Sequence, residues 1–158
     1  MSYQELVGNT DDTDVKVGIV VAKWNSFITD ELLQGALHAF NSKGVNENDI
    51  IVARCPGAYE IPFTTRKLLE KVDGVVTLGA VIQGDTPHFD YVCDAVNRGV
   101  TDLNMMGNKP VVFGVLTTDT VEQAQERCGL HGDKGNKGSE AALALLEMIS
   151  LGKSLNQL

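Results

Sequence analysis

Short, almost uninterrupted apolar runs alternate with segments of helical period along this chain. The runs do not alternate apolar and polar residues, and this pattern is typical of strands in a parallel sheet covered on both faces. They occupy residues 15–22, 49–53, 74–82 and 110–117. Segments with helical period occupy residues 30–43, 59–72, 88–106, 121–128 and 139–151. Both faces of the predicted sheet are therefore expected to be covered.

The β-α-β-α-β-α-β-α-α order requires right-handed crossovers between parallel strands. It predicts an α/β fold, a three-layer α/β/α sandwich around a flavodoxin-like four-stranded parallel sheet. We expect one domain, residues 15–158, after an acidic N-terminal tail, residues 1–14, that is free or ordered only against another chain. The last predicted helix is apolar on nearly every side, so it either packs against another subunit or is sunk in its own core.

Composition narrows the classes of partner. The net charge of −8 argues against nucleic acid, and neither a membrane span nor a signal-peptide pattern is present, so a cytoplasmic protein is expected. Cys55, Cys93 and Cys128 lack paired spacing and are expected to be buried, reduced thiols. The histidines His38, His88 and His131 are too scattered to indicate a metal site.

In open α/β sheets, ligands bind beyond the carboxyl ends of the strands. The first such loop places Trp24 at its tip, which favours a flat aromatic ligand; alternatively, Trp24 caps the core or an interface. In the second loop, Gly57 allows backbone to approach a ligand. Glu60 either accepts hydrogen bonds from ligand hydroxyls and amines or merely complements a helix dipole.

The third loop, residues 82–88, carries the strongest chemical signal. Thr86 is predicted as the N-cap of a helix that begins at Pro87. A phosphate could then rest on the amides of residues 84–86, with Gly84 allowing close approach, Asp85 contributing only its amide, and Thr86 adding its hydroxyl. His88 lies where a helix dipole favours neutral imidazole able to take a proton, unless it is a histidine satisfied inside the core.

Arg127 lies near the end of a helix, away from the strand tips of its own chain. A role in holding phosphate would therefore serve a neighbouring subunit, and the alternative is an ordinary surface arginine. The glycine-rich tract at 129–138 is cationic but lacks the spacing of a P-loop.

Several segments together resemble the lumazine synthase family over residues 15–148. They are PGAYEIP at 56–62, GAVIQGDTPHFDYV at 79–92, FGVLTT at 113–118, EQA at 122–124, ER at 126–127 and NKG at 136–138. The resemblance implies a transferase of riboflavin biosynthesis that condenses 5-amino-6-(D-ribitylamino)uracil with 3,4-dihydroxy-2-butanone 4-phosphate. The product is 6,7-dimethyl-8-ribityllumazine, and no cofactor or metal is needed.

The resemblance also implies roles for individual residues. Trp24 stacks on the pyrimidine ring and His88 moves protons, while Asp85, Thr86 and Arg127 hold phosphate beside Gly84. The ring and ribityl positions are lined by Ala58, Tyr59, Glu60, Val81 and Ile82. Phe113 from the adjacent chain and Lys137 complete the pocket.

The family assembles as homo-pentamers, in some members packed as twelve pentamers into a sixty-subunit shell. The loop before Asn136 is longer than is typical of shell-formers, which favours a free pentamer. Trp24 replaces the usual phenylalanine and Gln83 the usual arginine, so stacking is enlarged while phosphate affinity is expected to be lower. Two alternatives stay open: a non-catalytic flavin- or lumazine-binding module, and an assembly protein of the same fold.

Overall fold

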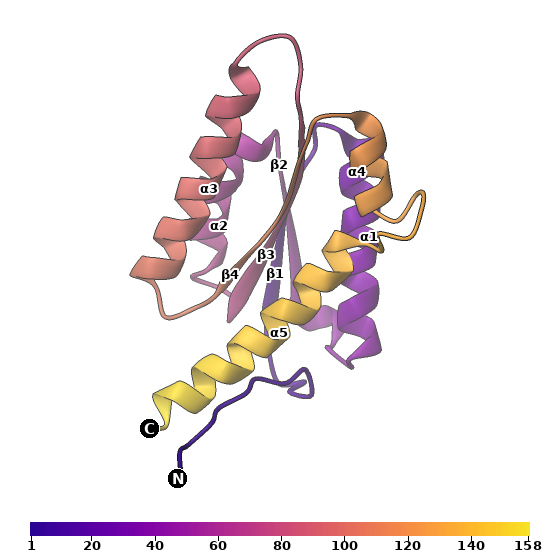
Figure 1. Ribbon diagram of the computed structural model, residues 1–158. Helices are drawn as coiled ribbons and strands as arrows, with labels where there is room; N and C mark the ends of the chain where they lie inside the picture. Colours follow the sequence, from indigo (N-terminus) through magenta and orange to yellow (C-terminus); the bar gives the residue numbers. More distant parts are fainter.

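The computed structural model describes residues 1–158 and shows a three-layer sandwich (Figure 1). Its sheet contains four parallel strands in the order β2-β1-β3-β4. The strands are β1 (Val17–Ala22), β2 (Ile50–Cys55), β3 (Gly74–Ile82) and β4 (Val111–Thr118). The helices are α1 (Ser26–Ser42), α2 (Ile61–Leu68), α3 (His88–Met106), α4 (Val121–Arg127) and α5 (Lys137–Asn156). The predicted α/β fold is confirmed.

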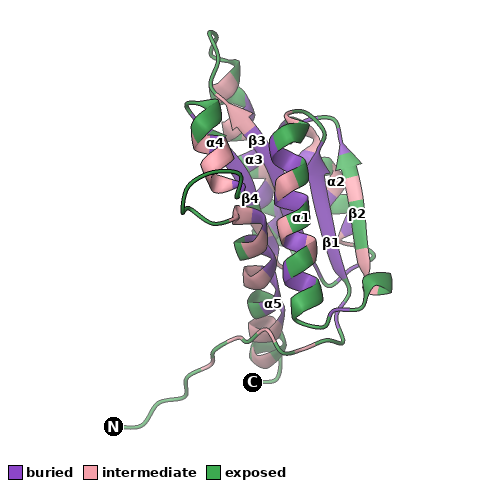
Figure 2. Cartoon of the chain, turned by 90° about the vertical axis from the view of Figure 1, so that its right-hand side faces the viewer, coloured by how far each residue is buried: buried purple, intermediate pink, exposed green.

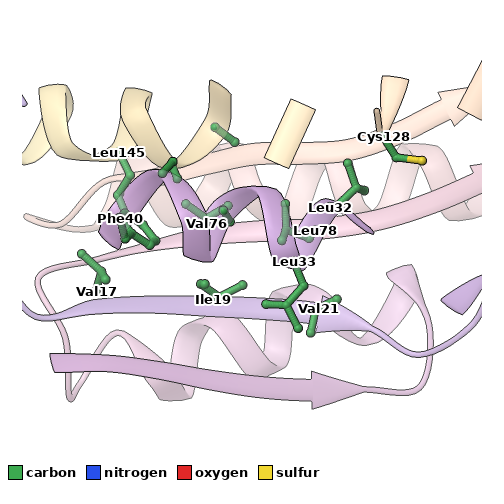
Figure 3. Packing of buried hydrophobic residues seen from close by; sticks show 14 of the residues in the cluster. Val17, Ile19, Val21, Leu32, Leu33, Phe40, Val76, Leu78, Cys128 and Leu145 are labelled. Carbon is green, nitrogen blue, oxygen red and sulfur yellow. The ribbon is translucent and has the colours of Figure 1, made fainter. Parts of the chain in front are cut away.

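Two hydrophobic layers hold the sheet between the helices. Side chains alternate along β1, so Val17, Ile19 and Val21 face α1 and α5, where Phe40 and Leu145 complete the packing (Figure 3). On the other face, Val20 and Ala22 pack in the layer formed with α2 and α3. Burial of each aliphatic side chain stabilises the folded state by about 1.5–3 kcal/mol. Because β1 has buried side chains on both faces, it stabilises both hydrophobic layers.

The expectation that both faces of the sheet are covered is wrong at β2. Cys55 is its only buried residue, whereas Ile51 and Val52 are each 38% exposed. The reason is position together with cover: β2 is an edge strand packed mainly by α2, whereas the other edge strand, β4, is packed by both α3 and α5. Figure 2 shows β2 largely exposed beside the buried β1. Apolar content alone could not reveal this edge.

Element boundaries agree with expectation at β3 and α3 and differ elsewhere. Helix α1 begins at Ser26, earlier than the predicted residue 30, and the predicted helix over 59–72 is a 3₁₀ turn (Ala58–Glu60) followed by α2. Helix α5 extends beyond the predicted 139–151 at both ends. No helix combines the length and the apolar character needed to cross a membrane.

The start of α5 is fixed by the side chain of Asn136. Its Oδ1 accepts hydrogen bonds from the backbone N–H groups of Gly138 (2.8 Å) and Ser139 (3.2 Å). Its Nδ2 donates to the carbonyls of Glu31 (3.0 Å) and Cys128 (2.9 Å). Because all four hydrogen-bonding positions of the amide are used, this one residue joins α1, α5 and the end of α4.

The tail is not free along its whole length, in contrast to expectation. The backbone N–H of Asn9 donates to Ser150 Oγ (3.2 Å), and Asp12 forms an ion pair with Lys153, so the tail contacts α5 of the same chain. The hydrogen bond from Lys153 holds the pKa of Asp12 below its usual value. Both groups are substantially exposed, so the pair adds little stability, and that contribution is lost as pH falls through the lowered pKa.

Helix α5 is buried mainly on the side that faces its own sheet. Ala142 and Leu145 are buried there, whereas Met148 is 45% exposed. The apolar character of the helix is thus only partly explained by the core of its own chain.

Close backbone packing between α1 and α5 predicts a large effect of Gly138→Ala. A Cβ at this position would lie 2.0 Å from the Leu32 carbonyl oxygen. That oxygen belongs to the backbone of α1, which cannot move away without separating the two helices. We expect the free energy of unfolding to fall by about 2 kcal/mol or more. Chemical denaturation followed by circular dichroism measures the change.

Gly152→Ala is the matched control, because it lies in the same helix with no atom within 4 Å of an added Cβ. Here the better helix propensity of alanine should raise stability by about 0.5–1 kcal/mol. Equal stability changes in the two variants would contradict the close-packing argument.

Candidate active site

A cavity of about 510 Å³ opens at the carboxyl ends of β1 and β3, on the side of α2 and α3. It exists because β1 pairs with β3 only as far as Val21 and Leu78, whereas β3 continues to pair with β4 as far as Ile82 and Thr118. The last residues of β3 therefore have no neighbouring strand on the β1 side, and loop residues line the space there.

Seven of the predicted site residues line this one cavity. They are Trp24, Ala58, Tyr59, Glu60, Val81, Ile82 and His88, and they are joined by Asn25, Ala80 and Val92. Residues from four separate segments thus converge, as expected for loops that share one edge of a parallel sheet.

Trp24 presents its indole ring to the cavity rather than to the core. The side chain is 63% exposed, and its ring lies directly on Gly57, where an added Cβ would meet Trp24 Cε3 at 2.3 Å. Its backbone N–H donates to the Pro56 carbonyl (3.0 Å). Trp24 therefore does not cap the core of its own chain, and one aromatic face is open to a flat ligand. The alternative that it caps an interface stays open.

Glu60 has one carboxylate oxygen engaged and one available. Its Oε2 accepts a hydrogen bond from the backbone N–H of Gly57 (3.1 Å), which fixes the turn beneath Trp24. Glu60 thus stabilises the turn at the start of α2 and can still accept a hydrogen bond from a ligand.

Cys55 lies at the end of β2, close to this turn, with its thiol directed at the Gly57 carbonyl (3.4 Å). Burial raises the pKa of the Cys55 thiol, and the negative charge of Glu60 raises it further. The thiol is therefore neutral near pH 7 and is not an activated nucleophile. Cys128 is also buried, but the expectation of burial is wrong for Cys93, which is only half-buried on α3.

The loop between β3 and α3 is exposed, and its cap differs from expectation by one residue. Helix α3 begins at His88 with Pro87 as the capping residue, so Thr86 is not the N-cap. Thr86 Oγ1 accepts only a long hydrogen bond from the His88 N–H (3.4 Å). Gly84 has no atom within 4 Å of an added Cβ, and Gly84, Asp85 and Thr86 lie beside the cavity without lining it.

His88 is exposed at the wall of the cavity, and its imidazole has no hydrogen-bond partner in the chain. The alternative of a histidine satisfied inside the core is therefore wrong. His38 and His131 are exposed and lie outside the cavity, and no group of three or more potential metal ligands occurs.

Phe113, Arg127 and Lys137 lie together in a second cavity of about 420 Å³, along β4 and the start of α5. Arg127 donates to the Gln123 carbonyl (3.0 Å) and lies 3.7 Å from Glu126, while Lys137 pairs with Glu140 (3.1 Å). Arg127 and Lys137 come from α4 and α5, whose buried residues pack in the same layer as α1, whereas His88 begins α3 in the other layer. Phe113 lies on the edge strand β4. One chain therefore carries the predicted residues as two separate groups.

Comparison with known proteins identifies the family. The family described as 6,7-dimethyl-8-ribityllumazine synthase matches residues 14–153. This chain belongs to the lumazine synthase family. A 6,7-dimethyl-8-ribityllumazine synthase from Parabacteroides distasonis is 46% identical over 142 residues, which cover 89% of this chain and 88% of that protein.

Membership of the lumazine synthase family confirms the resemblance carried by the motifs. The chain is an enzyme of riboflavin biosynthesis, and a non-catalytic flavin-binding module or assembly protein is not favoured. Among solved structures, a "putative diacylglycerol kinase from Bacillus anthracis str. Sterne" aligns with a TM-score of 0.44 and 13% identity. The match covers 87% of this chain but only 44% of that one, and likeness at this level carries no argument about function.

The position of Glu60 beside Cys55 predicts a pH effect for Glu60→Gln. Removing the negative charge should lower the pKa of the Cys55 thiol, while burial keeps it above the usual value. Nuclear magnetic resonance titration of the labelled cysteine β carbons measures each thiol separately. Cys93 and Cys128 serve as internal controls, since Glu60 is not among the groups that shift their pKa values.

Glu70→Gln, at the opposite end of the sheet strands, is the matched control and should leave the Cys55 titration unchanged. An unaltered Cys55 titration in Glu60→Gln, or the same downward shift in both variants, would contradict the electrostatic assignment.

Proposed function

We propose that this protein condenses 5-amino-6-(D-ribitylamino)uracil with 3,4-dihydroxy-2-butanone 4-phosphate to give 6,7-dimethyl-8-ribityllumazine, phosphate and water. The observation that carries the proposal is the exposed His88 at the wall of a cavity that also holds an open tryptophan face. The name of the relative from Parabacteroides distasonis supports the same reaction.

The cavity suits a pyrimidine with a polyhydroxylated side chain. Trp24 offers a stacking surface, and the uncovered end of β3 at Val81 and Ile82 offers backbone groups opposite it. Ala58 and Tyr59 form the adjoining wall, and the free oxygen of Glu60 can accept a hydrogen bond from a ribityl hydroxyl. Ring and side chain are thus recognised by different segments.

The loop before α3 suits the phosphate. Its backbone amides at Gly84, Asp85 and Thr86 precede a helix of 19 residues, and both the free N–H groups and the helix dipole favour an anion. The Asp85 carboxylate is exposed and is expected to turn away from the anion. The negative charge of the phosphate still needs a cation beside it, and we assign this role to the guanidinium of Arg127.

The chemistry requires proton transfers, and His88 is the group placed to perform them. The 5-amino group attacks the ketone, water leaves to form an imine, and phosphate is eliminated. A second condensation, with the ribitylamino nitrogen and loss of another water, then closes the ring. Each step moves a proton at the bound substrate, which a positioned imidazole can accept and return near neutral pH. We propose no cofactor and no metal.

Phe113, Arg127 and Lys137 act, in this proposal, on the site of a neighbouring copy. Their cavity shares no lining residue with the His88 cavity, and Arg127 and Lys137 belong to helices in the other layer from α3, so they do not complete the pocket of their own chain. We propose a free homo-pentamer in the cytoplasm, in which each interface joins one His88 cavity to one Arg127 cavity. The sixty-subunit shell is the other assembly that the family forms.

The reaction is tested by mixing the protein with both substrates and following the absorbance of the lumazine product. Absence of product above the uncatalysed background would refute the proposed activity. His88→Ala should lower turnover by about tenfold or more while the pyrimidine still binds, because only proton transfer is lost. Unchanged turnover in this variant would remove His88 from the mechanism.

Sharing of the site between subunits is tested by mixing two defective variants. His88→Ala and Arg127→Ala each disable one half of every interface, but a mixed assembly contains interfaces with both halves intact. After joint unfolding and refolding in equal amounts, roughly a quarter of the interfaces should regain full activity. Native mass spectrometry checks the assembly, and a mixture no more active than the mean of its parents would contradict the shared site.

A further inference from the structure

Asn25 has a backbone conformation that no other side-chain-bearing residue of the chain adopts. Its φ of 62° and ψ of 45° lie in the left-handed region, and every other residue with positive φ is a glycine. Asparagine tolerates this region better than most residues. The strand-to-helix turn after β1 therefore depends on this residue.

The side chain of Asn25 does not perform the usual task of its position. An asparagine at the N-cap of a helix ordinarily accepts a hydrogen bond from the first turn, but no such bond exists here. Instead, Nδ2 donates to the Ala80 carbonyl of β3 at 2.8 Å. Because a carbonyl only accepts, the amide nitrogen must face it, so the orientation of the side chain is determined.

This bond crosses the gap that forms the cavity. Regular pairing of β1 with β3 ends at Val21 and Leu78, and Ala80 lies beyond that point. The Asn25 amide thus links the two strands beyond the point where backbone hydrogen bonds between β1 and β3 end. It is also the residue directly after Trp24, and both line the cavity.

Trp24 is consequently held from two sides. On the β2 side, the backbone N–H groups of Lys23 and Trp24 donate to the carbonyls of Cys55 (2.8 Å) and Pro56 (3.0 Å). On the β3 side, the only link is the Asn25 side chain. We propose that Asn25 is a positioning residue, which fixes the indole of Trp24 relative to the backbone of Val81 and Ile82. This sets the width of the slot for the pyrimidine ring, a role that rests on the proposed function.

Two substitutions separate the hydrogen bond from the backbone conformation. Asn25→Gly keeps the left-handed turn and removes the amide, while Asn25→Asp keeps the side-chain shape and replaces the donor by an acceptor. The matched control is Asn46→Gly, which also removes an asparagine from a helix N-cap but lies before β2, at the opposite end of the strands. Circular dichroism and an unfolding curve establish that each variant is folded.

Trp24 is the only tryptophan, so its fluorescence reports directly on the proposed role without substrate. We expect a faster local component of the anisotropy decay in Asn25→Gly and Asn25→Asp, and none in Asn46→Gly. In steady-state kinetics, the KM for the aminouracil should rise by about fivefold or more, with the KM for the butanone phosphate and the pH profile nearly unchanged.

Unchanged anisotropy decay in both Asn25 variants would overturn the proposal, as would a mobile Trp24 with unchanged KM for the aminouracil. Equal increases of both KM values, or the same changes in Asn46→Gly, would also overturn it, since they indicate a general loss of structure. If the unmodified protein makes no lumazine, the proposed reaction fails, and the anisotropy measurement still decides whether Asn25 holds Trp24.

Discussion

Parallel pairing of two strands buried on both faces, β1 and β3, is the constraint from which the other features of this structure follow. Parallel strands need long crossovers, and the crossovers place helices on both sides of the sheet. All four strands then end at the same edge, so every loop that can carry chemistry is brought to one end of the molecule. The N-terminal tail enters at the other end, where it contacts α5.

Two asparagine side chains act where regular secondary structure stops. Asn25 links β1 to β3 after their pairing has ended, and Asn136 joins α5 to α1 and α4. In both places a backbone carbonyl would otherwise lack part of its hydrogen bonding, and an amide side chain can donate and accept at once. Each asparagine also lies next to a proposed substrate-binding residue, Trp24 in one case and Lys137 in the other. Local folding and site geometry are therefore fixed by the same bonds.

The sequence predicted best those elements whose signals are local. The bounds of β3 and α3 were correct because a long apolar run ends at a glycine-containing loop, and because a Thr-Pro pair marks the helix start to within one residue. The start of α1 was missed because Asn25 signals a turn, but its left-handed backbone conformation, after which the helix begins at once, cannot be read from a single sequence. The start of α5 was missed although its cap is local, because the Asn136 side chain is held in place by the carbonyls of Glu31 and Cys128, the first of which is distant in sequence. Burial of β2 was overestimated because strand order and the helices that cover each edge strand, and not composition, decide it.

The same distinction applies to the candidate site. Residues predicted from the segments that follow β1 and β2, and from the end of β3 and the start of α3, line one cavity, because parallel topology brings these segments together. Gly84, Asp85 and Thr86 of the loop between β3 and α3 do not line it. That Asn25 belongs with them was not predicted, although an asparagine following the last residues of a buried strand is a recognisable turn signal. That Phe113, Arg127 and Lys137 line a separate cavity depends on how α4 and α5 pack against β4, which requires the three-dimensional structure.

This separation makes assembly part of the proposed chemistry. A guanidinium near the phosphate would strengthen an anion site that otherwise has only amides and a helix dipole. In the isolated chain, Arg127 is instead occupied with the Gln123 carbonyl and the nearby Glu126, on the far side of the sheet from His88. A single chain would thus bind the pyrimidine half of its substrates better than the phosphate half. In the proposed pentamer, the cation arrives with the neighbouring subunit, so activity would depend on protein concentration wherever the assembly dissociates.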